Sequence, residues 1–193
     1  MKYGPGQKEE ARTRILGAVG RGFRRLGYGG IGVDGLAKEA SVTSGAFYGH
    51  FPSKAEAFKA AALIGLVELR EGIEHLRASE GDAWLAAFAD FYTSVRRSCE
   101  LGESCALQSL TPDVARADSD TKIAYEAELL KVVDAVANGL QHGTLAARRK
   151  TAWAILSVLS GGVTLARSAD DEKVGANIAN AIKSAVLILA KAG

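Results

Sequence analysis

The apolar residues of this chain recur at the period of an α-helix, and nowhere do they sustain the alternation typical of a β-strand. Only three prolines interrupt its 193 residues, so long helices meet few obstacles. Hydrophobic residues make up 48% of the chain and charged residues 24%, which is ordinary for a globular protein with a sizeable core. The sequence therefore predicts an all-α fold of about nine helices.

Glycines, prolines and capping residues divide the chain into these helices. Gly27 is placed to end the first helix, as a C-cap glycine would. Ser53, followed three residues later by Glu56, has the spacing of a capping box and is expected to open a long helix. The predicted helices span residues 8–26, 33–40, 44–50, 54–77, 81–99, 104–110, 119–139, 144–168 and 170–192.

Charge is distributed unevenly, although the whole chain carries a formal net charge of only +2. Residues 1–54 hold nine Lys or Arg and four acidic residues, whereas the rest of the chain holds fifteen basic and eighteen acidic residues. A basic first part beside an acidic remainder suggests that the first part meets a polyanion. The bias is weak support by itself, because many solvated helices share it.

Residues 10–53 have the pattern of a helix-turn-helix. Two short helices around Ser41-Val42-Thr43 cannot bury much by themselves, so they need the first helix as a platform. In this arrangement the second short helix enters the DNA major groove, which admits one helix. On spacing alone, any other three-helix bundle would look similar. The apolar stripe expected to form the platform is Ile15, Leu16, Val19, Phe23 and Leu26.

The same stretch resembles the DNA-binding domain of the TetR family of transcriptional regulators. The resemblance covers residues 14–54 without a gap and centres on SVTSGAFYGHFPSK, residues 41–54. It implies a helix-turn-helix DNA-binding domain, residues 1–53, and a ligand-sensing and dimerisation domain, residues 54–193. It also implies a ligand-responsive regulator, more often a repressor, that a small molecule releases from a palindromic operator.

Carried over by position, the resemblance implies which side chains meet double-stranded operator DNA. The alternative for His50 is a cap at the helix C-terminus, and for Tyr48 a half-buried spacer. Five apolar positions are expected to be largely core: Leu36, Ala37, Val42, Phe47 and Phe51. The expected base contacts come from Thr43, Ser44 and Ala46, and the expected phosphate contacts from Lys38, Tyr48, His50 and Lys54.

Two positions depart from the family pattern. Gly32 stands where Thr or Ser usually caps the second helix, so that contact must come from elsewhere or be missing. Gly49 stands where the family often has a large residue. With small side chains here, few bidentate base contacts are possible. We therefore expect much of the affinity to be directed at the DNA backbone and to be sensitive to salt.

The remaining residues predict an effector cavity and a dimer interface. The resemblance implies a small apolar or aromatic effector bound among the helices, although the aromatic residues could simply be core. The predicted ligand-binding residues are Phe88, Tyr92, Leu107, Tyr125 and Trp153.

The last two helices carry small and apolar residues that would let helices approach closely, as in a four-helix homodimer interface. They could equally pack within one chain. The residues concerned are Ala154, Ser157, Val158, Gly161, Gly162, Leu165, Ile178, Ala181, Ile182, Ala185 and Leu189.

Other patterns point to no chemistry. The G-x-G-x-x-G at residues 27–32 follows a helix rather than a strand, so a dinucleotide site is not expected. The three histidines lack metal-ligand spacing and no catalytic set is recognisable, so no enzyme activity, cofactor or metal is expected. Cys99 and Cys105 are expected to be free thiols, with redox sensing as an alternative. With no signal peptide or membrane span expected, the chain is predicted to be cytoplasmic, without a membrane partner.

Two other functional classes remain open at this point. One is a helical enzyme or carrier with a hydrophobic cavity, and the other is a protein–protein interaction module built on the same three helices. Neither explains Tyr48-Gly49-His50-Phe51 followed by Ser53-Lys54. Steeply salt-dependent DNA binding would exclude both.

Overall fold

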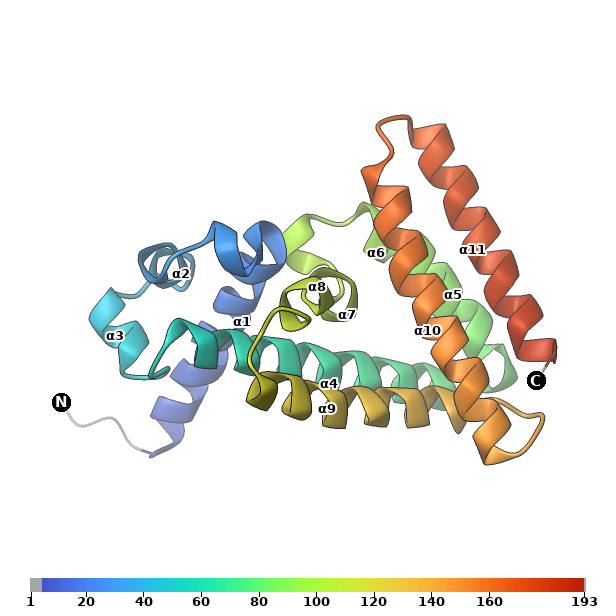
Figure 1. Ribbon diagram of the computed structural model, residues 1–193, viewed down its shortest axis with the longest axis horizontal. Helices are drawn as coiled ribbons and strands as arrows, with labels where there is room; N and C mark the ends of the chain where they lie inside the picture. Colours follow the sequence, from blue (N-terminus) through green and yellow to red (C-terminus); the bar gives the residue numbers. More distant parts are fainter. Residues whose placement is uncertain (1–4, 193) are drawn as a thin grey trace. The chain divides into compact units, whose positions relative to one another are not determined.

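The structure is a computed structural model that describes residues 5–192. Every regular element in this range is a helix, so the all-α prediction is confirmed (Figure 1). Contacts divide the chain into two compact units. The first contains the residues up to Gly65 together with Leu101–Tyr125, and the second contains Leu66–Glu100 and the residues from Glu126 onward. The functional division at residues 53 and 54 stays a prediction, because compactness does not assign function.

The first unit contains the helices of the expected helix-turn-helix. One of the two hydrogen bonds of the predicted capping box forms at the start of α4 (Lys54–Glu80): the Glu56 amide donates to Ser53 Oγ at 3.1 Å. The elements of this unit are α1 (Pro5–Gly30), α2 (Val33–Glu39), α3 (Ser44–Tyr48), the first part of α4 (Lys54–Glu80), η2 (Leu101–Glu103), α7 (Ala106–Ser109), α8 (Thr111–Val114) and the first part of α9 (Ser119–Ala137).

Helix α1 supplies the platform that its apolar stripe predicts, with one exception. Ile15, Leu16, Val19 and Phe23 are buried, whereas Leu26 is 50% exposed. The helical geometry breaks directly after Leu26, because the next residue, a glycine, has φ 72 and ψ 169. Leu26 therefore stands at the end of the regular helix, past the last turn that packs on the core.

The segment 101–125 belongs to the first unit because it holds the end of α1. Arg24 Nε donates a hydrogen bond to the Gly102 carbonyl oxygen at 2.6 Å, and the Tyr28 amide donates to Asp113 Oδ2 at 2.8 Å. The Asp113 carboxylate thus caps the short helical turn that follows the break in α1. Phe58 of α4 completes this region, with its ring edge-on to that of Tyr28 at 5.1 Å.

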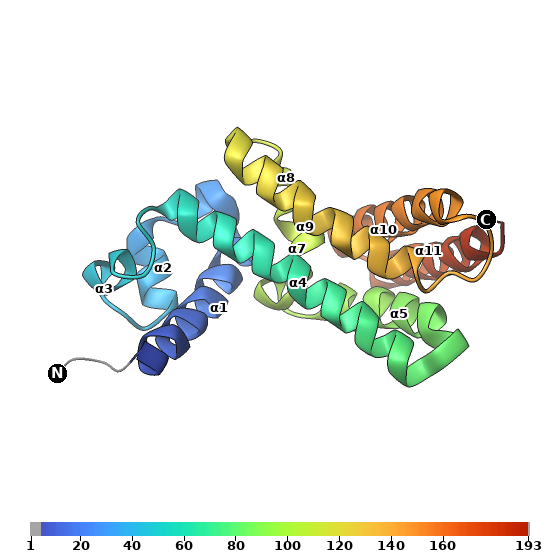
Figure 2. The ribbon, with the colours of Figure 1, turned by 90° about the horizontal axis from the view of Figure 1, so that it is seen from below.

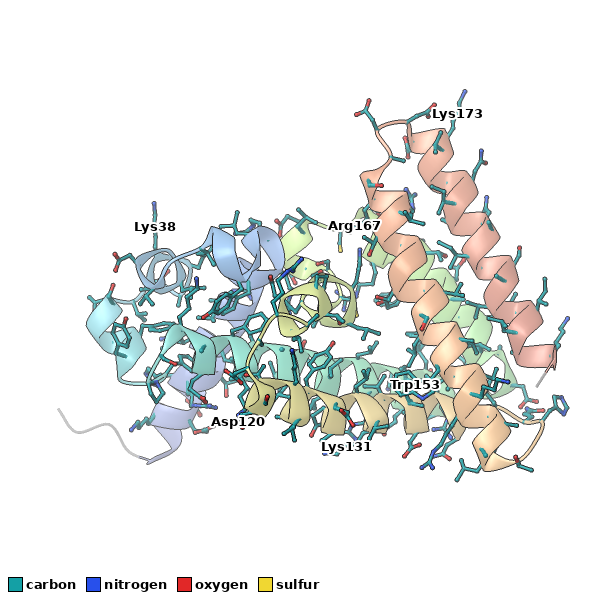
Figure 3. The ribbon with its side chains drawn as sticks, in the orientation of Figure 1. Lys38, Asp120, Lys131, Trp153, Arg167 and Lys173 are labelled. Atoms are coloured by element: carbon teal, nitrogen blue, oxygen red, sulfur yellow. The ribbon has the colours of Figure 1, made fainter. Side chains whose placement is uncertain are left out.

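The second unit is built around a hairpin of two long helices, α10 (Leu145–Ser168) and α11 (Glu172–Ala192). These helices lie side by side in Figures 1 and 2. Gly162 lets them approach, because a Cβ at this position would overlap the side chain of Ile182. Arg167 anchors the hairpin to the residues after α5 by donating to the carbonyl oxygens of Arg96 and Cys99 at 2.6 and 2.8 Å (Figure 3). The elements of this unit are the rest of α4, η1 (Gly81–Ala83), α5 (Trp84–Thr93), α6 (Val95–Ser98), the rest of α9, α10 (Leu145–Ser168) and α11 (Glu172–Ala192).

The single helix predicted over residues 81–99 is wrong: the structure has η1, α5 and α6 instead. The break falls at Ser94, which no Gly or Pro marks in the sequence. Thr93 Oγ1 donates to the Ala89 carbonyl oxygen at 2.7 Å, and Ser94 Oγ donates to that of Asp90 at 2.6 Å. Two successive hydroxyls that bond back to the preceding turn can bend a helix, and both lie at this break.

One described helix is long and apolar enough to cross a membrane, judged by length and composition alone. It is the Glu172–Lys191 stretch of α11, with a mean hydropathy of 1.2. A helix of a soluble protein passes the same test, so the finding is weak support for a membrane span.

Candidate nucleic-acid interface

A closed turn joins α2 to α3 and fixes the angle between them. The Val42 amide donates to the Ala37 carbonyl oxygen at 2.9 Å, and the Ser41 amide donates to that of Lys38 at 3.0 Å. Ser41 has φ 54, the left-handed conformation that this helix ending requires and that glycine usually supplies. These two bonds satisfy carbonyl groups that the end of α2 would otherwise leave open.

Thr43 caps α3. Its Oγ1 accepts a hydrogen bond from the Ala46 amide at 3.1 Å. Phe47 is completely buried, while Thr43 and Ala46 are exposed. At the start of α2, Gly32 makes no side-chain cap, so the contact that the family pattern would place there is missing.

The structure places Tyr48 and His50 at the C-terminal end of α3. Tyr48 is 53% exposed, and its ring packs edge-on against Phe47 at 5.6 Å between centroids. Tyr48 is therefore more exposed than the half-buried spacer considered as its alternative. His50 is half-buried, and within the described part of the chain its Nδ1 is buried with no hydrogen-bond partner. Any polar contact made by this imidazole is thus left to Nε2.

Two lysines flank α3 in the sequence. Lys38 is exposed in the last turn of α2, and its side chain extends away from the helix (Figure 3). Lys54, the first residue of α4, is half-buried, and its Nζ lies 4.3 Å from the centroid of the Tyr28 ring. The aromatic ring holds the ammonium group by a cation–π contact and so limits where it can reach.

Sequence reasoning missed Asp34. Ser44 Oγ donates a hydrogen bond to Asp34 Oδ1 at 2.6 Å, which joins the first residue of α3 to the first turn of α2. Nothing in the spacing of these residues signals the contact, because the turn between the helices creates it. A second link between elements is the ion pair of Arg25 with Glu39 at 2.6 Å.

The described side chains thus divide into a buried layer and a set of exposed or half-buried residues. Four of the five positions expected to be core are buried, namely Leu36, Ala37, Phe47 and Phe51, whereas Val42 is half-buried. The residues expected at DNA are exposed or half-buried, and they lie on α2, on or directly beside α3, and at the start of α4 (Figure 1). Hydroxyl, ammonium and imidazole groups of this kind can bind phosphates and base edges. The role of each residue at DNA stays a prediction.

The comparisons with known proteins agree with this geometry. Residues 15–61 match the family model described as bacterial regulatory proteins, tetR family. Over these residues the chain is similar to the tetR family. The match includes α2, α3, the turn between them and the first residues of α4, which are the elements of the expected helix-turn-helix. No curated protein matches the chain.

Several solved structures share the fold over nearly the whole chain. Escherichia coli NemR in its reduced form aligns with a TM-score of 0.76 and 17% identity, over 92% of this chain and 95% of NemR. A TetR-family regulator from Streptomyces coelicolor aligns with a TM-score of 0.73 and 22% identity, over 94% and 97%. FadR from Bacillus subtilis, in complex with stearoyl-CoA, aligns with a TM-score of 0.66 and 14% identity, over 90% and 96%.

The residues predicted to bind an effector are divided between the two units. Leu107 and Tyr125 are buried in the first unit, and Phe88 and Tyr92 are buried in the second, where their rings lie 5.6 Å apart. Trp153 is 40% exposed on α10. Whether these residues share one cavity stays a prediction.

A hollow of about 380 Å³ in the first unit involves none of these five residues. Its polar groups already have partners within the protein. The Tyr28 amide and Arg116 contact Asp113, and Asp118 accepts from the Thr121 amide at 2.7 Å. The lining includes Tyr28, Phe58, Asp113, Arg116, Asp118 and Thr121.

Proposed function

We propose that this protein is a TetR-family, ligand-responsive repressor that binds a palindromic operator as a homodimer and leaves it when a small molecule binds. The observation that carries the proposal is that Thr43, Ala46 and Tyr48 are exposed on and beside a short helix that the buried Phe47 anchors to the core. Major-groove recognition needs a helix that is held by its core and leaves other side chains free to meet DNA. Such a protein acts by binding rather than catalysis, in the cytoplasm where its DNA lies.

The exposed face of the α10–α11 hairpin supports the homodimer. A Cβ on Gly161 would meet no atom within 4 Å, whereas one on the adjacent Gly162 would overlap Ile182. Gly162 therefore allows close packing within the chain, whereas Gly161 is free to allow the close approach of a second copy. Large apolar residues of the same two helices are also exposed, and a second copy would cover them. They are Trp153, Leu165, Val174 and Ile188, which are 40%, 63%, 47% and 66% exposed.

The effector proposal rests on buried aromatic side chains and on one structural relative. FadR is in complex with stearoyl-CoA, a ligand with a long apolar acyl chain. In this chain Phe88, Tyr92 and Tyr125 are buried aromatic residues that could face such a ligand. We expect a small apolar or aromatic effector that shifts the protein toward a state in which its recognition helices no longer fit DNA.

DNA binding can be tested by fluorescence anisotropy with the DNA upstream of the gene, at two salt concentrations. Tight binding should weaken steeply with salt, because phosphate contacts release counterions. Tyr48→Ala should weaken binding. Lys38→Ala should lower affinity for every sequence and reduce the salt slope by about 1. Lys173→Ala removes the same charge from an exposed site in the second unit and should leave the slope unchanged.

Two outcomes would contradict the proposal. One is binding to upstream and genomic DNA that never exceeds the non-specific level. The other is an equal effect of Lys38→Ala and Lys173→Ala on the salt slope, which would mean that the charge of the whole chain drives binding. Loss of the complex on adding candidate effectors tests ligand response, and a reporter gene separates repression from activation.

A further inference from the structure

A carboxylate fixes the hydroxyl of one of the predicted base-reading residues. Ser44 Oγ donates to Asp34 Oδ1 at 2.6 Å, and Asp34 is exposed. A serine hydroxyl has one proton and two lone pairs, whereas an ionised carboxylate can only accept hydrogen bonds. The bond therefore uses the single proton of Ser44. What remains available on this oxygen is acceptor capacity.

The hydroxyl of the neighbouring residue, Thr43, is instead left with its proton free to donate. Thr43 Oγ1 accepts a hydrogen bond from the Ala46 amide at 3.1 Å, so its proton stays available for donation. Two adjacent residues at the start of α3 are thus prepared for different partners: Thr43 can donate to a base or phosphate acceptor, and Ser44 can only accept.

The major groove offers few donors to such an acceptor. Adenine presents its N6 amino group and cytosine its N4 amino group, whereas guanine presents only acceptors and thymine presents an acceptor and a methyl group. We propose that Asp34 makes Ser44 an acceptor-only reader, so that each operator half-site places an adenine or a cytosine opposite Ser44. This inference rests on the proposed operator binding and specifies which bases that site reads.

The position of Asp34 is consistent with a role in specificity. A negative side chain beside α3 repels phosphates and lowers affinity for DNA of any sequence. Its remaining lone pairs can accept from the same amino group, as carboxylates do from cytosine N4. A guanine or thymine at this point would instead bring its acceptor against the oxygens of both Asp34 and Ser44. The pair therefore favours one class of base and disfavours the other, which is how specificity arises.

The test begins with the full-length protein and a pool of random double-stranded DNA, from which bound sequences are selected. Within the selected site, each adenine is replaced by 2-aminopurine and each cytosine by 2-pyrimidinone, which remove the major-groove amino group. At the position that Ser44 reads, the analogue should weaken wild-type binding by about fivefold to tenfold, the usual range for one lost base contact. Ser44→Ala should bind the normal and the analogue DNA equally well at this position only.

A second variant tests the part played by Asp34. Asp34→Asn has the same shape but can also donate a hydrogen bond, so the Ser44 proton is no longer committed. This variant should tolerate guanine or thymine at the same position, with a preference at least about fivefold weaker than that of the wild type. Glu56→Gln is the matched control, because it removes one negative charge from the first unit while glutamine still suits the capping box. It should leave the preference unchanged.

The outcomes separate this inference from the proposed function. If the wild type selects no sequence from the pool, the operator-binding proposal fails. If it selects a site but Ser44→Ala remains as sensitive to every analogue as the wild type, the inference is overturned. It is also overturned if Ser44→Ala or Asp34→Asn weakens binding to all sequences by one common factor, which would mark the pair as purely structural. Circular dichroism melting of each variant shows that the helices remain folded.

Discussion

At the scale of single residues, Tyr125 shows how the protein interior changes an ionisable group. Burial raises the pKa of Tyr125 to about 12, although the hydrogen bond with Thr111 Oγ1 at 2.7 Å acts in the opposite direction. Thr111 Oγ1 in turn donates to the Leu107 carbonyl oxygen. The phenol is therefore part of an internal network and would have to exchange a partner before it could contact an effector.

This shift predicts a loss of stability at alkaline pH. A tyrosine whose pKa is higher in the folded than in the unfolded state stabilises the fold fully below the unfolded value, about 10. As pH rises from about 10 to about 12, the unfolded chain loses this proton first, and the free energy of unfolding should fall by about 2–3 kcal/mol. Urea unfolding across this range measures the effect. In Tyr125→Phe, the free energy of unfolding should change less with pH over this range. The same pH dependence in the variant and the wild type would refute the role of Tyr125.

Two glycines of α4 predict opposite effects of the same substitution. A Cβ at Gly65 would overlap the Cβ of Ala106, whereas one at Gly72 would meet no atom within 4 Å. Gly65→Ala should therefore destabilise the protein by about 1–3 kcal/mol through overpacking. Gly72→Ala should stabilise it by about 0.5–1 kcal/mol, because alanine favours the helix. Thermal melting of the two variants checks both signs, and a shift in the same direction for both would contradict this packing.

At the scale of elements, most helices could be predicted from local signals, and the exceptions have physical causes. The end of regular α1 at Gly27 and the start of α4 follow from glycine, capping residues and apolar spacing. The break at Ser94 could not be predicted, because it depends on whether hydroxyls bond back to the preceding turn. The contact of Asp34 with Ser44 needs the turn geometry, which apolar periodicity does not encode.

The turn between α2 and α3 predicts the effect of changing Ser41. Its φ of 54 is strained for a residue with a Cβ but not for glycine. Ser41→Gly should raise the free energy of unfolding by up to about 1 kcal/mol, while Ser41→Val should lower it by at least as much. Chemical denaturation of the two variants gives both values. Equal stability of the glycine and valine variants would show that this residue is not in the left-handed conformation in solution.

At the scale of the whole molecule, the exposed face of the α10–α11 hairpin predicts the oligomeric state. Leu165→Glu with Ile188→Glu would bury two unpaired charges in the proposed homodimer. The dimer should weaken by about 3–5 kcal/mol, which is about a hundredfold or more in the dissociation constant. Analytical ultracentrifugation measures this change. Operator affinity should fall with it, because two half-sites then meet separate monomers.

Ile123→Glu serves as the control for this double variant. Ile123 is 67% exposed on α9 and does not belong to the hairpin, so its substitution should leave the dimer intact. If all three glutamate substitutions left one stable dimer, the interface would lie elsewhere on the chain. If none of these proteins, including the wild type, formed a dimer, the palindromic operator would also have to be abandoned.

The discontinuous first unit has a consequence for how the protein is made. Its second part, Leu101–Tyr125, leaves the ribosome only after a further stretch of chain has followed Gly65. At about 5–20 residues per second, the delay from residue 65 to residue 125 is about 3–12 s. During that interval Arg24 and Tyr28 lack the Gly102 and Asp113 oxygens that later hold them. A nascent or truncated protein that ends near residue 65 would therefore contain an incomplete first unit, which proteases and chaperones can reach. A fusion protein built from the first unit needs residues 101–125 as well.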